Sequence, residues 1–254
     1  MIPGVKSSEN VVVRPGDPGV PILISVEHAS CALPPGVDLG VSQELLESHW
    51  GWDRWAEDTL LRFAPDLGIT TISARLSRLL IDVNRGLQDD TLIRTECGGE
   101  PVPGNFDLSA AELAERIERF HAPYHRAIDG ELGALVERCG RERAVFFTFH
   151  SFTPDYEDQD RDFDVGVLFD AHEDLAAGVK RALATAGLRT RLNEPYSGYR
   201  GEIYSASVHG EAHDVAYFEI ELNQGVLEDP ERRQRIADVF RQVVPAIFPH
   251  LPNR

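Results

Sequence analysis

The chain has 254 residues, of which 42% are hydrophobic and 26% are charged. These proportions are typical of a packed globular protein and exclude a wholly disordered or fibrous chain. The 42 Asp and Glu residues outnumber the 25 Lys and Arg residues, and the net charge of −17 argues against nucleic acid or an anionic membrane as a partner.

Residues 1–19 are polar and rich in Pro and Gly, and they predict an extended lead-in to a single domain spanning residues 1–254. They lack the apolar stretch of a signal peptide, and no apolar run reaches the roughly 20 residues that cross a bilayer. The three cysteines, Cys31, Cys97 and Cys139, are too few and too far apart for a disulfide framework or a cysteine-based zinc site. We therefore expect a reduced, cytoplasmic protein.

Apolar runs and helical periodicity alternate along the chain. Strands are expected at residues 21–26, 69–76, 79–83, 144–149, 165–169, 189–193 and 215–222. Helices are expected at residues 42–63, 109–139, 175–186 and 230–247, the second opening with the capping box of Ser109 and Glu112. This alternation predicts an α/β domain of three layers, a mostly parallel or mixed sheet with helices on both faces. In such sheets ligands bind beyond the carboxyl ends of the strands.

Two expected strands end close to a histidine. Glu27 and His28 follow the run at 21–26, and His150 follows the run at 144–149. Each histidine alone suits either catalysis or a hydrogen bond that shapes a loop, but two at separate strand ends favour an assembled site. Because no His-Glu-x-x-His motif is present, a zinc site here has to combine distant segments.

His49 and Asp53 are four residues apart in an expected helix, so they would share one face. Imidazole and carboxylate are ligands that suit zinc. An ion pair on the helix surface is the alternative interpretation.

The segment 77–85 combines Arg78, Asp82, Asn84 and Arg85 around an apolar run. Arginine presents a planar fork of donors that matches a carboxylate, so these arginines could bind an anionic substrate. The alternative is that Asp82 and Arg85 pair with each other or with neighbours.

Glu219 and Glu221 alternate within an otherwise apolar strand and therefore point to one face. Burying two carboxylates together is costly unless a cation or a proton transfer uses them. A carboxylate beside a metal-activated water is the usual general base of metal-assisted hydrolysis. A solvated face of an edge strand is the alternative.

Seven pieces resemble the N-formylglutamate amidohydrolase family, in the same order along nearly the whole chain. They are EHAS with the downstream LPPG, HWGWDRWAEDTL, SRLLIDVNR, the PGN of PVPGN, HSFTP, NEPYSG and EIELNQ. The family is similar to the zinc carboxypeptidase-like hydrolases. The resemblance implies a mixed sheet between helices, one metal ion, and an arginine that binds the substrate carboxylate.

The resemblance also implies a ligand set for Zn²⁺. His28 and His150 match the metal histidines, and Asp53 matches the carboxylate ligand. Glu27 and His49 are the alternatives to Asp53 as the third ligand.

Other roles follow from the same resemblance. Asn84 and Arg85 match the pair that holds a substrate carboxylate, Arg78 is a candidate second anion clamp, and Glu221 matches the glutamate that handles protons. Further substrate contacts are expected from Asn105, Ser151, Tyr196 and His209.

These observations predict a zinc-dependent amidohydrolase that acts on a small anionic N-acyl amino acid such as N-formylglutamate. Two alternatives stay open: a metal-free cysteine hydrolase that uses Cys31 near His28, and a protein of the same fold that binds an acidic metabolite without turnover. The acyl group, the amino acid, the native metal and the oligomeric state are left open by the sequence.

Overall fold

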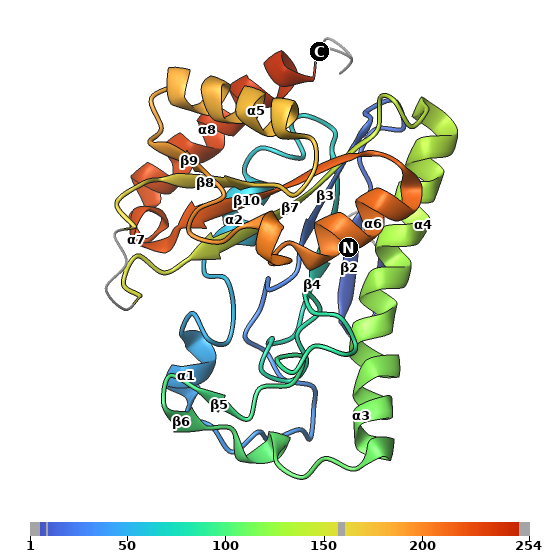
Figure 1. Ribbon diagram of the computed structural model, residues 1–254, viewed down its shortest axis with the longest axis vertical. Helices are drawn as coiled ribbons and strands as arrows, with labels where there is room; N and C mark the ends of the chain where they lie inside the picture. The colour runs from blue at the N-terminus through green and yellow to red at the C-terminus, as the bar shows by residue number, and fades with distance from the viewer. Residues whose placement is uncertain (1–5, 9, 157–160, 249–254) are drawn as a thin grey trace.

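A computed structural model describes residues 6–8, 10–156 and 161–248. An eight-stranded sheet runs through these residues in the order β1-β2-β4-β3-β7-β10-β8-β9 (Figure 1). Its strands are β1 (Lys6–Ser7), β2 (Val11–Arg14), β3 (Ile22–Val26), β4 (Thr70–Ala74), β7 (Val145–Phe152), β8 (Val165–Leu168), β9 (Thr190–Leu192) and β10 (Ala216–Asn223).

The sheet is mixed. Strands β4, β3, β7 and β10 run parallel, whereas β2 is antiparallel to β4 and β8 is antiparallel to β10. Every residue of β3 and β7 is buried, as expected for strands covered on both faces. The carboxyl ends of the parallel strands meet at one edge, and this edge carries the predicted site residues.

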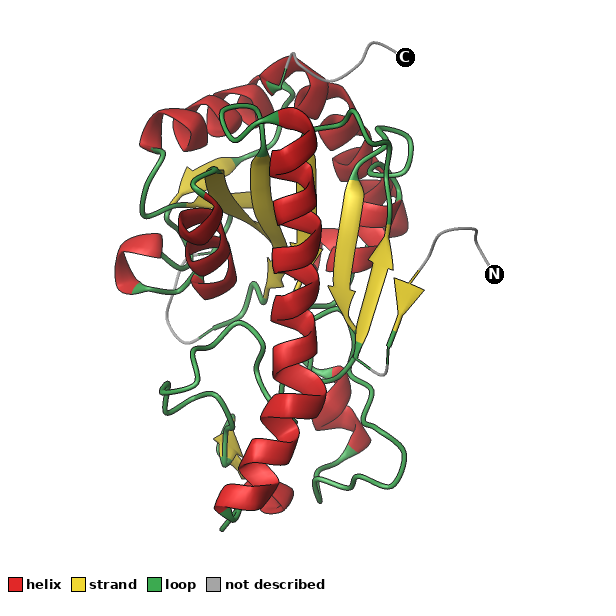
Figure 2. Ribbon diagram, turned by 90° about the vertical axis from the view of Figure 1, so that its right-hand side faces the viewer, coloured by secondary structure: helices red, strands yellow, loops and turns green. Residues whose placement is uncertain are grey.

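Helices cover both faces, so the predicted three-layer architecture is confirmed. One face packs against α2 (Ala56–Leu61), α5 (Glu173–Thr185) and α8 (Pro230–Ile247). The other face packs against α4 (Ala122–Cys139) and α6 (Tyr204–His213). In Figure 2 the long α4 and the preceding α3 (Ala110–Arg116) stand in front of the sheet. The shorter helices are α1 (Gln43–Glu47) and α7 (Gln224–Leu227).

Smaller elements complete the described chain. A two-stranded sheet joins β5 (Glu96–Cys97) to β6 (Glu100–Pro101). The 3-10 turns are Pro103–Asn105 and Gly198–Arg200, and a π-helical turn at Ile117–His121 joins α3 to α4. The predicted capping box of Ser109 and Glu112 opens α3. Among the described helices, none is both long and apolar enough to cross a bilayer.

The helix expected at residues 42–63 is wrong. Ser42 caps α1, but α1 ends at Glu47 and α2 begins only at Ala56. Gly51 packs so closely in the intervening turn that a Cβ atom there would lie 1.9 Å from the Leu46 carbonyl oxygen. The backbone N–H of Asp53 donates to the carbonyl of His28 (2.9 Å). The segment therefore turns toward the sheet edge, and His49 and Asp53 do not share a helix face.

The strand expected at residues 79–83 is also wrong. These residues form turns in which Leu80 N–H donates to the Ser77 carbonyl and Arg85 N–H donates to that of Asp82. Leu79, Leu80 and Ile81 are buried in a separate cluster under the loops, and Val83 packs in the cluster between the sheet and α4. The lead-in expected at residues 1–19 is extended where it is described, but it contributes β1 and β2 to the sheet.

Candidate metal centre and active site

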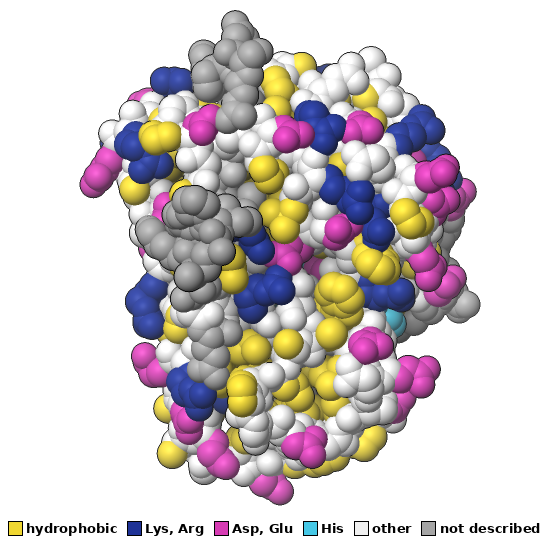
Figure 3. Space-filling model, turned by 180° about the vertical axis from the view of Figure 1, so that it is seen from behind, with side chains coloured by type: hydrophobic (Ala, Val, Ile, Leu, Met, Phe, Trp, Pro, Cys, Tyr) yellow, Lys and Arg dark blue, Asp and Glu magenta, His cyan; other side chains and the backbone are white. Residues whose placement is uncertain are grey.

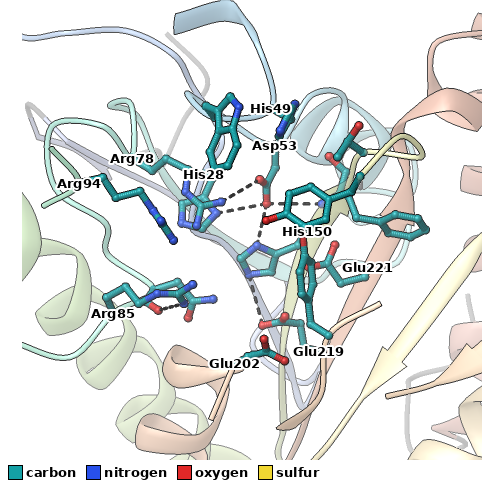
Figure 4. Close-up of a pocket in the computed structure, with 17 residues that line it drawn as sticks. His28, His49, Asp53, Arg78, Arg85, Arg94, His150, Glu202, Glu219 and Glu221 are labelled. Carbon is teal, nitrogen blue, oxygen red and sulfur yellow. Dashed lines mark hydrogen bonds and ion pairs between the residues drawn. The ribbon is translucent and has the colours of Figure 1, made fainter. Parts of the chain in front are cut away.

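A cavity of about 230 Å³ opens at the carboxyl edge of β3, β7 and β10 (Figure 4). Segments far apart in the sequence line it, as expected for a site at the end of a parallel sheet. The predicted site residues that line it are His28, Asp53, Arg78, Asn84, Arg85, His150, Ser151, Tyr196 and Glu221.

His28, Asp53 and His150 form the centre of this cavity. Each is buried and offers one ligand atom, and the three atoms lie within 4.8 Å of one another. Asp53 Oδ2 is 2.7 Å from His150 Nδ1 and 3.3 Å from His28 Nδ1. The predicted ligand set is therefore the one that the fold brings together.

Strand neighbours explain this convergence. His28 follows the end of β3 by two residues, and His150 lies near the end of the adjacent β7. Within β10, Glu219 is paired with Thr148 and Glu221 with His150. The side chains of Thr148, His150, Glu219 and Glu221 point to the face that α4 and α6 cover, because alternate residues of neighbouring strands share a face.

Each of the two histidines also faces a second carboxylate. His28 Nε2 lies 2.7 Å from Asp82 Oδ1, and His150 Nε2 lies 2.9 Å from Glu27 Oε2. The Nδ1 atoms of both rings therefore face Asp53 while the Nε2 atoms face buried acids. Carboxylates in such positions fix the tautomer and the orientation of metal-binding histidines.

Glu27 was an alternative third ligand, and its surroundings give it a different position. Glu27 Oε1 accepts hydrogen bonds from Tyr124 Oη (2.7 Å) and Ser25 Oγ (2.9 Å). Burial disfavours the ionised Glu27, but His150 and the hydrogen bond from Tyr124 outweigh burial and lower its pKa. Glu27 is thus held behind His150. His49, the other alternative, lines the cavity but is outside the three-residue group.

Asp82 is a site residue whose role sequence reasoning missed. Arg78 donates to Asp82 Oδ2 through Nη2 (2.7 Å) and Nε (3.1 Å), and Asn84 N–H donates to Oδ1 (2.9 Å). Burial disfavours the charged Asp82, but Arg78 and His28 overcome this and hold its pKa well below the ordinary value. Asp82 pairs with Arg78 rather than with Arg85, whose Nε lies 3.9 Å from Asp89 Oδ2, so the alternative in which Asp82 and Arg85 pair with neighbours holds for these contacts.

Glu219 and Glu221 are buried in the middle of the sheet, so the edge-strand alternative is wrong. Glu219 Oε2 accepts a hydrogen bond from Thr148 Oγ1 (2.7 Å) and lies 3.4 Å from His150 Nε2. Glu221 Oε2 is buried and has no hydrogen-bond partner among the described residues. Burial raises the pKa of Glu219 to about 7, and burial with the neighbouring Glu219 raises that of Glu221 well above its usual range.

These residues fit a divalent cation. Five buried carboxyl groups surround the two imidazoles, those of Glu27, Asp53, Asp82, Glu219 and Glu221. Among the described arginines that line the cavity, only Arg78 forms ion pairs with these carboxyl groups, at Asp53 and Asp82. A cation would compensate this excess of acids and the unpartnered oxygen of Glu221. Two histidines and one carboxylate, with a position left open, are typical of catalytic zinc sites. Such nitrogen and oxygen donors also suit cobalt, manganese and iron.

Asn84 and Arg85 lie on a braced segment at the cavity wall. Asn84 Oδ1 accepts from Ser205 N–H (2.9 Å), which leaves the amide nitrogen as the group available to a ligand. Arg85 donates through Nε to Thr91 (3.0 Å) and through Nη1 to the Asn84 carbonyl (2.9 Å). His121 Nε2 lies 2.9 Å from the Arg85 carbonyl oxygen. Both side chains are thus presented to the cavity at fixed positions.

Comparison with known proteins matches the chain to a family. A family model described as N-formylglutamate amidohydrolase covers residues 20–228. The chain belongs to this family.

Individual relatives agree. The chain is 30% identical over 249 residues to an N-formylglutamate deformylase of Pseudomonas aeruginosa, which spans 89% of this chain and 90% of that protein. A solved gene product of Agrobacterium tumefaciens superposes with a TM-score of 0.85 at 27% identity, covering 94% of this chain and 95% of that one. The N-formylglutamate amidohydrolase of Ralstonia eutropha shares the fold, with a TM-score of 0.74, 17% identity and coverage of 94% and 98%.

Two expected substrate contacts of this N-formylglutamate amidohydrolase family member lie outside the cavity. Asn105 donates to the carbonyls of Leu79 (2.8 Å) and Arg94 (2.6 Å), so it braces loops. His209 lies between α6 and α4, where its Nδ1 is 2.8 Å from Asp129 Oδ1. Neither residue is among those that line the cavity.

Six cavity-lining residues were not named as candidates from the sequence of this family member: Trp50, Arg94, Phe152, Thr153, Tyr156 and Glu202. Phe152 is the last residue of β7, and the other five come from loops or turns, where no periodic pattern marks a side chain as inward-facing. The motif HWGWD and the polar stretch 84–107 contained the only signals for Trp50 and Arg94.

Proposed function

We propose that the protein is a metal-dependent hydrolase that cleaves the amide bond of a small N-acyl amino acid, with N-formylglutamate as the first candidate. The deformylase activity named for the Pseudomonas aeruginosa relative supports this substrate. The observation that carries the proposal is the convergence of His28, Asp53, His150 and the unpartnered Glu221 oxygen in one cavity.

His28, Asp53 and His150 are the residues that would hold the metal, and zinc is the ion we propose. A divalent cation supplies Lewis-acid activation of water and polarises an amide carbonyl. Asp82 and Glu27 hold the two imidazoles so that the Nδ1 atoms face Asp53. The protein's own contribution is thus a prearranged set of donors in a buried position.

Glu221 is the group we assign to proton transfer. Its Oε2 has no hydrogen-bond partner among the described residues, whereas the Oε2 of Glu219 is engaged by Thr148. A carboxylate with a free oxygen can accept a proton from the attacking water and return it to the departing amine.

Asn84 and Arg85 are the residues we assign to the carboxylate of the amino acid. Arg85 keeps donors beyond the hydrogen bonds it makes to Thr91 and to the Asn84 carbonyl. Its fork and the Asn84 amide would fix the carboxylate so that the scissile carbonyl lies beside the metal ligands.

The direct test is formate release from N-formyl-L-glutamate. We expect turnover by the zinc-loaded protein, its loss after chelation, and its recovery on addition of zinc. His150→Ala should abolish turnover, and His213→Ala, which changes a histidine outside the cavity, should preserve it. A zinc-loaded protein that releases neither formate nor any other acyl group from a panel of N-acyl amino acids would overturn the proposal.

The cysteine alternative has less support. Cys31 is not among the residues that line the cavity. Burial and the nearby Glu47 raise the pKa of its thiol, which disfavours the reactive thiolate. The same assay distinguishes the binding-protein alternative, because a protein that only binds the substrate releases no formate.

A further inference from the structure

The three arginines of the cavity differ in what already engages them. Arg78 forms hydrogen bonds with Asp82 and also lies 3.7 Å from Asp53. Arg85 donates to Thr91 and to a backbone carbonyl. The Arg94 guanidinium has no hydrogen bond or ion pair with any residue in the described part of the chain.

Hydrogen bonds nevertheless hold the backbone of Arg94 in place. Its carbonyl oxygen accepts a hydrogen bond from the Asn105 amide (2.6 Å), and Arg116 donates to the other side of that amide (2.6 Å). Two residues earlier, the Leu92 carbonyl accepts from Asp82 N–H (2.8 Å). The backbone that carries Arg94 is therefore hydrogen-bonded to the segment of Asp82, whose side chain contacts His28.

The Arg94 side chain is directed into the cavity. Figure 4 shows its guanidinium end on the same side as Arg85, across the cavity from Glu219 and Glu221. Glu202 also lines the cavity, but its carboxylate accepts from Ser197 N–H (2.7 Å) and pairs with Arg200 (2.8 Å). Among the described residues, Arg94 is thus a partly buried cation with no ion-pair partner, which favours binding of an anion.

The rest of the protein makes this cation unusual. The net charge is −17, and on the face shown in Figure 3 acidic and basic side chains are interspersed. An anionic ligand therefore gains no attraction from the molecule as a whole and depends on local donors. A cavity of about 230 Å³ admits only a small molecule, so two anion-binding groups in it suit a compact dianion.

We propose that Arg94 determines specificity by binding the second carboxylate, the side-chain carboxylate of an acidic N-acyl amino acid, while Asn84 and Arg85 hold the first. This inference rests on the proposed function. It assigns the choice of glutamate over neutral amino acids to one residue outside the metal ligands and outside the Asn84-Arg85 pair.

The test compares N-formyl-L-glutamate with N-formyl-L-glutamine, which has nearly the same shape but a neutral side chain. The Arg94→Met variant should lose about 10- to 100-fold in kcat/KM for the glutamate compound, mainly through KM, and less than about 3-fold for the glutamine compound. Arg94→Lys should recover part of the preference. Arg126→Met removes an exposed arginine of α4 as a control and should change neither substrate.

A binding measurement separates this inference from the proposed function. Glutarate, a dicarboxylate without an amide, should bind the zinc-loaded protein and should bind Arg94→Met at least about 10-fold more weakly. Equal losses on both formyl substrates, or unchanged glutarate binding in Arg94→Met, would overturn the role of Arg94. If the parent protein hydrolyses neither formyl compound but binds glutarate through Arg94, the anion site stands and the proposed function fails.

Discussion

Glu221 and His150 lie directly opposite each other on the paired parallel strands β10 and β7. The register places a buried carboxylate with an unpartnered oxygen beside a candidate metal-binding imidazole. A one-residue slip of either strand would turn one of these side chains to the opposite face of the sheet. The pairing of the strands is therefore what places the proposed proton-transfer group next to the proposed metal site.

The substitution Glu221→Gln tests this arrangement. Because the amide cannot accept the proton, kcat should fall by about 10²- to 10⁴-fold. The variant should still bind one equivalent of metal, since Glu221 is not among the three ligand residues. Formate release and elemental analysis of the same sample measure both quantities. Retention of most of the activity would show that another group carries the proton.

Asp82 provides a test of histidine positioning. Asp82→Asn weakens the contact with His28 Nε2 and leaves Arg78 without its main partner. We expect zinc affinity to fall about 10- to 100-fold, measured by competition with a chromogenic chelator. Asp90→Asn, at an exposed position of the same loop, is the control and should bind zinc as the parent does. Equal affinities in all three proteins would contradict a positioning role.

Gly51 tests whether the turn at residues 48–55 positions Asp53. A Cβ atom at Gly51 would meet the Leu46 carbonyl at 1.9 Å, so Gly51→Ala should lower the free energy of unfolding by about 1–3 kcal/mol and weaken zinc binding. At Gly19 a Cβ atom meets nothing within 4 Å, and Gly19→Ala should leave both properties unchanged. Chemical denaturation and zinc titration are the measurements. A tolerated Gly51→Ala would show that the turn adapts easily.

The buried His125, away from the metal site, should make the free energy of unfolding fall at acidic pH. Burial, together with His121 and His209, lowers the pKa of His125 to about 3. Between that value and about 6.5, the ordinary pKa of histidine, the unfolded chain binds a proton that the folded protein does not. This group therefore makes stability fall as pH drops through that range. His125→Gln should show a shallower loss of unfolding free energy between pH 7 and pH 4.5, and an unchanged slope would contradict the assignment.

The sequence contained enough to predict the layered fold and the strand ends. Apolar runs such as 21–26 and 144–149 mark strands buried on both faces, and a histidine near the end of each marks the edge where ligands bind. The two histidines of the metal group could be anticipated for this reason, whereas Asp53 as the third ligand was implied by the resemblance to the family. The alternation of Glu219 and Glu221 similarly predicted that both point to one face of the strand, and in the structure both line the cavity.

What the sequence could not provide depends on tertiary contacts. Periodicity across 42–63 suggested one helix, but the close packing of Gly51 and the hydrogen bond from Asp53 to His28 divide it. The apolar run at 79–83 forms turns rather than a strand, and three of its side chains are buried in a loop cluster. The roles of Asp82 and Arg94 arise from loops folded over the strand ends, and no local pattern records such folding.

We propose that His28, Asp53 and His150 bind a catalytic metal ion. The most direct test is the metal content of the purified parent protein and of folded His28→Ala and His150→Ala variants, measured by elemental analysis. We predict about one equivalent of zinc or another divalent metal in the parent and its loss in both variants. A metal-free parent that also takes up no added zinc would contradict the account.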